Sequence, residues 1–435
     1  MSSITHNPIT HRLEQLVDLW RDFASDDNAR VCHWVLEADE VTMVDAFVQV
    51  ENANEARTDD LFIRLRSPFH SSEQYSLALL EELAAEWEAY QQFIPKKALP
   101  LQWSLQLPSQ PIQAQHFVDS FAQFALQTPD FEGLAVAVLT PDELYDPTVF
   151  SEWLAEALKG NFSTQIRFMI IDLEANQHFT TLATRFPTKV RSIAPQLDMP
   201  AAMEEIAATG DPNDPGVQYR QLYVKVTQCI STGQLEKMEQ LGQSGIAIAI
   251  SQEWNYLAVS MYLALASGYI GRSQPHTAIE RYDQGIQIAD AGWQAEDPLC
   301  TKLLIQALLS KGSVLYGNSN YEEAAAVYEQ AVAPAITLAD NMSMLEAWRM
   351  AAFCHEQNQA YDAAWEANQK ALQAGSELPE DIPPHTTTLP YVGTALLRLL
   401  EPLDRQPKEQ TIRGQLKALC GPNWEPDHQN QAATH

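Results

Sequence analysis

A two-helix pattern recurs four times in the second half of the chain and restricts the possible folds more than any other feature. In the copy that begins at Tyr321, small and aromatic residues follow one another at spacings of four and three, as on one face of a helix. The anchor positions of the four copies are 40, 46 and 40 residues apart, at Met238, Ala278, Ala324 and Ala364. Twelve residues before each anchor is a packing position: Val226, Ala266, Gly312 and Ala352. Apolar residues precede these by four: Leu222, Tyr262, Leu308 and Trp348.

This pattern resembles the tetratricopeptide repeat, a helix–turn–helix unit in which small residues let the two helices pack closely. The usual period is 34 residues, so these units carry longer helices or loops, as in kinesin-light-chain-like variants. Four units cover residues 217–375. Helices within 376–420 are expected to cap the last repeat, because a solenoid must cover its exposed end. Residues 421–435 form a polar tail.

The resemblance implies that the first helix of each unit lines a concave groove that binds an extended peptide or a partner helix. A Lys/Asn clamp for a terminal carboxylate is absent from the corresponding slots, so an acidic chaperone tail is not the expected ligand. The predicted partner-binding residues are Arg220, Tyr223, Thr227, Leu263, Ser267, Gln306, Leu309, Ser313, Tyr316, Arg349, Phe353 and Glu356.

The first half of the chain alternates short apolar runs with amphipathic helical stretches, which predicts an α/β domain with a mostly parallel sheet over residues 1–210. The glycine- and proline-rich segment 210–216 marks the predicted boundary with the repeats. Aromatic stripes such as Phe117, Phe121 and Phe124 indicate buried helix faces. The predicted strands are Val31–Leu36, Leu61–Leu65, Trp103–Leu107, Leu134–Leu139, Ile166–Ile171 and Val190–Ile193.

No catalytic motif stands out in this domain. The run from Arg167 to Glu174 resembles the strand-plus-acid element of P-loop ATPases, and the domain is thus vaguely like a degenerate P-loop NTPase. The chain has no G-x-x-x-x-G-K-[ST] loop, and only three of its 17 glycines precede residue 211. We therefore interpret Asp172 as a strand-end residue that caps the next helix. His33, His70, His116 and His178 are scattered singly, and no cofactor or metal is predicted.

Charge and cysteine usage narrow the range of partners. Lys and Arg number 27 against 57 Asp and Glu, a net charge of −30, which disfavours nucleic acids and anionic membrane surfaces. Five widely spaced cysteines and the lack of a signal core or bilayer-spanning run indicate a reducing cytoplasm, and the composition favours a bacterial source.

These features together predict a non-enzymatic scaffold or adaptor that binds a basic or amphipathic protein segment. One such role is that of a chaperone for a client awaiting secretion. The alternative is a nucleotide-binding or signalling regulator, in which the repeats control an NTPase-like α/β domain. The sequence leaves the oligomeric state open.

Overall fold

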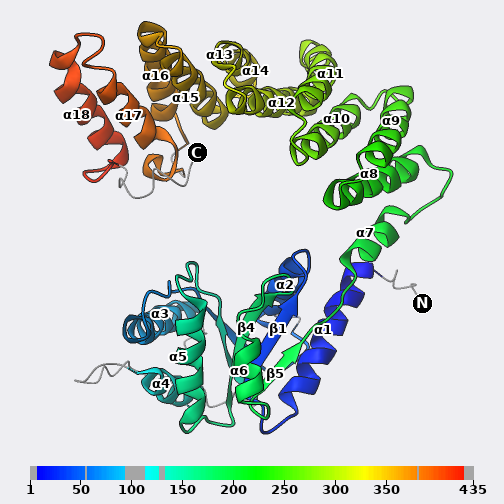
Figure 1. Ribbon diagram of the computed structural model, residues 1–435, viewed down its shortest axis with the longest axis vertical. Helices are drawn as coiled ribbons and strands as arrows, with labels where there is room; N and C mark the ends of the chain where they lie inside the picture. The colour runs from blue at the N-terminus through cyan, green and yellow to red at the C-terminus, as the bar shows by residue number, and fades with distance from the viewer. Residues whose placement is uncertain (1–6, 54–55, 94–112, 127–132, 380–381, 426–435) are drawn as a thin grey trace. The chain divides into compact units, whose positions relative to one another are not determined.

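The computed structural model describes residues 7–53, 56–93, 113–126, 133–379 and 382–425. Its internal contacts divide the chain into two compact units, Met1–Ile206 and Ala207–His435. The first unit is an α/β domain and the second is an array of helical hairpins (Figure 1). Both fold classes are those predicted from the sequence.

The first unit is built on a five-stranded sheet in which all described strand pairs are parallel. The strand order is β2-β3-β4-β1-β5, so that β1 lies between β4 and the edge strand β5. Parallel strands covered on both faces read as continuous apolar runs, which is why these segments could be recognised. The expected strand Trp103–Leu107 lies outside the described residues. The strands are β1 (Val31–Leu36), β2 (Leu61–Leu65), β3 (Ala135–Leu139), β4 (Ile166–Leu173) and β5 (Val190–Ile193).

Helices cover both faces of this sheet. On one face, Trp20 of α1 and Phe47 of α2 pack against Trp34 and Met169. On the other, the predicted aromatic stripe of α4 packs with α3, α5 and α6 against alternate residues of the same strands. The helices are α1 (Pro8–Ala24), α2 (Val41–Glu51), α3 (Ser72–Phe93), α4 (Ala114–Leu126), α5 (Pro147–Lys159), α6 (Thr180–Arg185) and α7 (Met199–Ala207).

The second unit is a row of antiparallel helix pairs. The first helices are α8 (Pro215–Thr232), α10 (Asn255–Ile270), α12 (Pro298–Gly317) and α15 (Asn341–Gln357). Their partners are α9 (Leu235–Ser251), α11 (Pro275–Gln294), the pair α13 (Tyr321–Gln330) with α14 (Val332–Thr337), and α16 (Tyr361–Ser376). A final hairpin follows, made of α17 (Leu389–Arg398) and α18 (Glu409–Cys420), with the short 3-10 turns η1 (Pro384–Thr386) and η2 (Gln406–Lys408).

The anchor residues of the repeat pattern lie where the helices of each pair meet. Met238, Ala278, Ala324 and Ala364 are all fully buried, and so are Val226, Ala266 and Ala352. The second helix of the third pair departs from the simple pattern, because it breaks at Ala331 into α13 and α14. Pro334 explains the break: it has no N–H for the carbonyl of residue 330, and its ring crowds that turn.

Candidate functional site

The first helices of the repeat array form one continuous layer. Helix α8 contacts α10, α10 contacts α12, and α12 contacts α15. The twelve predicted binding residues all lie on these four helices, and none of them is buried. Five are exposed: Arg220, Thr227, Ser267, Gln306 and Ser313. The other seven are half-buried: Tyr223, Leu263, Leu309, Tyr316, Arg349, Phe353 and Glu356.

Two of the predicted residues come together across neighbouring repeats. The rings of Tyr316 on α12 and Phe353 on α15 lie edge to face, with centroids 5.5 Å apart. Tyr321, at the start of α13, adds a third ring 5.7 Å from Tyr316. The three half-buried rings form an aromatic cluster at the junction of the third and fourth hairpins. Such clusters supply rigid contact area, the kind of group that dominates interface energies.

The charged members of the predicted set are already paired within the array. Arg349 donates to both carboxylate oxygens of Glu346, at 2.9 and 2.6 Å. Glu356 accepts two hydrogen bonds from Arg398 of α17, at 2.5 and 2.8 Å. The first pair lies within α15, and the second joins α15 to the final hairpin. Truncation of Arg349 or Glu356 would therefore affect stability as well as any binding.

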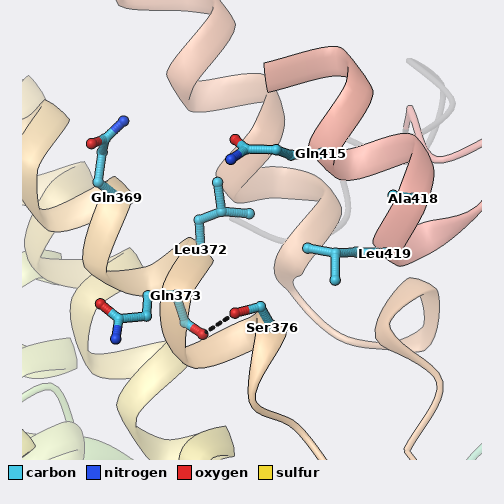
Figure 2. Close-up of a pocket in the computed structure, with 7 residues that line it drawn as sticks. All are labelled: Gln369, Leu372, Gln373, Ser376, Gln415, Ala418 and Leu419. Carbon is cyan, nitrogen blue, oxygen red and sulfur yellow. Dashed lines mark hydrogen bonds between the residues drawn. The ribbon is translucent and has the colours of Figure 1, made fainter. Parts of the chain in front are cut away.

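A hollow on the second-helix side of the array was not predicted from the sequence. The hollow has a volume of about 490 Å³ and lies between α16 and α18. Figure 2 shows the side chains that line it. Ser376 Oγ donates to the carbonyl of Gln373 at its rim, 2.7 Å away. The lining is uncharged and mixes amides with apolar side chains: Gln369, Leu372, Gln373, Ser376, Gln415, Ala418 and Leu419.

In the first unit, the carboxyl ends of the strands are where an open α/β sheet binds ligands. Acidic residues gather there, on the loops that follow β1, β4 and β5. Glu37 is an exposed residue, and slight desolvation together with the negative charges of Asp39, Glu40, Glu174 and Asp198 raises its pKa. The charges acting on this carboxylate are thus all negative, the opposite of what a phosphate group needs.

Asp172 lies near the end of β4, as interpreted from the sequence, but α6 has no side-chain cap, so the expected capping of the next helix is not what Asp172 does. Its Oδ2 accepts the backbone N–H groups of His178 and Phe179, at 2.9 and 2.8 Å, just before α6. The same oxygen lies 2.9 Å from Nε2 of the buried His33. Burial raises the pKa of Asp172, but these hydrogen bonds outweigh that effect and the net pKa is lowered. The pairing with His33 was missed, because 139 residues separate the two in sequence.

Other kinds of site find little support in the part of the chain that the structure describes. No cluster of three or more His, Cys, Asp or Glu residues there is arranged to hold a metal ion. Among the described helices, none is long and apolar enough to cross a membrane.

Comparisons with known proteins yield structural similarities only. No family model matches the chain, and no curated protein does so either. BtubC from P. vanneervenii matches 53% of this chain and 92% of its own, with 17% identity and a TM-score of 0.39. The apo form of RapI matches 52% of this chain and 59% of its own, with 10% identity and a TM-score of 0.40.

One further match spans both units of the chain. It is a Signal Transduction ATPase with Numerous Domains (STAND) protein with a tetratricopeptide repeat sensor, from Pyrococcus horikoshii. It covers 94% of this chain and 90% of its own, with 9% identity and a TM-score of 0.25. Similarities at this level concern the fold and carry no functional information. The class of this protein therefore follows from its own architecture, an α/β domain followed by a tetratricopeptide-like helical array.

Proposed function

We propose that the repeat array acts as a scaffold or adaptor with no catalytic role of its own, and that it binds a partner peptide or helix on its first helices. The aromatic cluster of Tyr316, Tyr321 and Phe353 carries the proposal, because its rings are only half-buried and two of them, Tyr316 and Phe353, lie on the layer of first helices. Half-buried aromatic side chains on a rigid element are the usual anchors of an interface.

Charge suggests the chemistry of the partner. Residues beyond position 210 include 14 basic and 26 acidic ones, a net charge of −12. Arg349 on α15 and Arg398 on α17 are already paired with carboxylates. A basic or amphipathic segment would therefore be attracted to this surface, and an acidic one repelled. A cytoplasmic chaperone that holds such a client before secretion is one form of this function.

The binding test compares three full-length proteins as baits in a pull-down from the native host. The Tyr316→Ala, Phe353→Ala double variant should lose the partners that the wild type recovers, since aromatic anchors typically contribute about 2 kcal/mol each. The control is Ile336→Ala, which removes a side chain that is 62% exposed on α14, part of the second helix of the third pair. If the double variant melts normally and keeps every partner, the binding face is not here.

The alternative function is a nucleotide-dependent regulator, which an all-parallel sheet with a crevice at its carboxyl edge would suit. Two observations weigh against it: the chain has no phosphate-binding loop, and acidic residues surround Glu37 at that edge. Calorimetry with ATP or GTP and magnesium separates the two functions. Micromolar binding would overturn the scaffold-only proposal, whereas no heat of binding is what we expect.

A further inference from the structure

Three side chains on adjacent strands of the sheet form a connected hydrogen-bond chain. His33 lies on β1, with Asp172 on β4 to one side and Ser192 on the edge strand β5 to the other. The ring Nε2 of His33 is 2.9 Å from Asp172 Oδ2, and its Nδ1 is 2.8 Å from Ser192 Oγ. The parallel register pairs His33 directly with Ser192, so the contact follows from strand alignment.

The hydrogen bonds determine which nitrogen of His33 carries the proton. Asp172 Oδ2 accepts two backbone N–H groups, from His178 and Phe179, which can only donate. Such an oxygen is that of a carboxylate, so it also accepts the Nε2–H of His33. In the neutral ring Nδ1 is then an acceptor, and the hydroxyl of Ser192 is the donor to it. This is the orientation in which an imidazole can remove a proton from a serine.

The three hydrogen-bonded residues differ in burial as a nucleophilic site requires, with a buried base and an exposed serine. His33 is 1% exposed and Asp172 is 3% exposed, while Ser192 is an exposed residue of the edge strand. The ring of Phe179 lies edge-on to His33, with centroids 6.0 Å apart, and helps to fix the imidazole. The base is thus shielded from water, and the residue that carries the activated hydroxyl lies on the exposed edge of the sheet.

We propose that Ser192 is a base-activated nucleophile that takes an acyl group from a small ester, an activity separate from the scaffold function. Ser192 Oγ forms a bond to the ester carbonyl carbon while its proton passes to His33 Nδ1. As the carbon–oxygen bond to the alcohol breaks, that proton moves to the departing oxygen. Water then attacks the acyl-serine, with His33 again accepting and returning the proton, which releases the acid. Asp172 is a positioning residue.

The edge position of β5 adds a further element of such a site. An edge strand presents backbone N–H groups that no neighbouring strand takes up. N–H groups of this kind stabilise the negative charge that develops on a carbonyl oxygen during acyl transfer. A hydrogen bond with a purely structural role does not need an accessible serine. Ser192, by contrast, is an exposed residue, which favours a chemical role.

The first test treats the full-length protein with a fluorophosphonate probe and with p-nitrophenyl acetate. We expect mass spectrometry to place the label on Ser192, and the Ser192→Ala variant to lose labelling and at least ten times the esterase rate. Ser25 is the matched control, because it is exposed in the same unit and its hydroxyl donates to the carbonyl of Asp22. Ser25→Ala should behave like the wild type. A wild-type protein that is not labelled at Ser192 overturns the proposal.

The second test avoids the risk that a variant of buried His33 does not fold. Ser192→Cys and Ser25→Cys each place one exposed thiol on the surface, and only the first lies beside an imidazole. At pH 6 we expect Cys at position 192 to react with iodoacetamide at least ten times faster than Cys at position 25, because the imidazole takes its proton. Equal rates at the two positions would refute a base at Ser192.

Discussion

Gly312 and Tyr328 lie so close together that a Cβ atom on Gly312 would be 2.6 Å from Cε1 of the tyrosine ring. Gly312 belongs to α12 and the buried Tyr328 to α13, so this contact sets how closely the third hairpin packs. We expect Gly312→Leu to force these helices apart at a cost of about 1–3 kcal/mol or more. Thermal unfolding should record a melting temperature lower by roughly 2–12 °C.

The control for this substitution is on the same helix. A Cβ on Gly317, at the end of α12, meets nothing within 4 Å. Gly317→Leu introduces the same side chain without a steric clash, and its melting temperature should stay near that of the wild type. Equal effects of the two substitutions would contradict the assigned packing of the third hairpin.

The repeat array should fold without the α/β domain. The sequence predicts repeats and capping helices over residues 217–420, and the structure shows two flanking contacts that belong with them. Asp214 caps α8 through the amides of Gly216 and Val217, and the buried Trp424 packs close to Gly393. We expect a fragment of residues 211–425 to be helical by circular dichroism and to melt cooperatively, since a solenoid's contacts are between neighbours. An unfolded fragment would place the domain boundary elsewhere.

The features that could be predicted from the sequence are those that depend on local periodicity. The anchors Ala324 and Ala364 repeat within helices, and the strands are apolar runs, so both could be recognised from short windows. The break at Pro334 was also readable, because proline cannot continue the hydrogen bonding of a helix. The hydrogen bond between His33 and Ser192 could not be predicted from the sequence, since it depends on strand order and register, which no local pattern specifies.

The same reasoning applies to the candidate binding face. The repeat pattern predicts Tyr316 and Phe353 on first helices, and the structure brings their rings together. The pairing of Arg349 with Glu346 lies three residues away on the same helix, so it could have been foreseen from spacing. The cavity between α16 and α18 forms only when the final hairpin packs against α16, so it could not be predicted from the residues that line it.

The cysteines should be unreactive in the folded protein. All five are buried and none is in a disulfide. Burial, with the neighbouring carboxylate of Asp297, raises the pKa of Cys300 to about 12, and burial raises that of Cys354 to about 12. Because only the thiolate attacks, Ellman's reagent at pH 8 should release little colour from the native chain and five equivalents after denaturation in guanidinium. Rapid reaction of several native thiols would show that these hairpins open readily.

Glu346 should make the repeat array sensitive to acid. Burial opposes its charge, but hydrogen bonds from Arg349 and Thr388 and the charge of Arg349 lower its pKa overall. A carboxylate whose pKa is lower when folded stabilises the protein above its ordinary value of about 4.3, and this contribution is lost as pH falls through the folded pKa.

We therefore expect Glu346→Gln to melt below the wild type at neutral pH, and the two melting curves to converge as the pH falls towards about 3. The pair is partly exposed, with 24% and 37% of the Arg349 and Glu346 side chains accessible, so the difference should be no more than about 1 kcal/mol. Glu366→Gln, at an exposed position on α16, is the control and should follow the wild type at every pH. A gap between Glu346→Gln and the wild type that stays constant with pH would mean that the substitution acts through packing and not through the charge of Glu346.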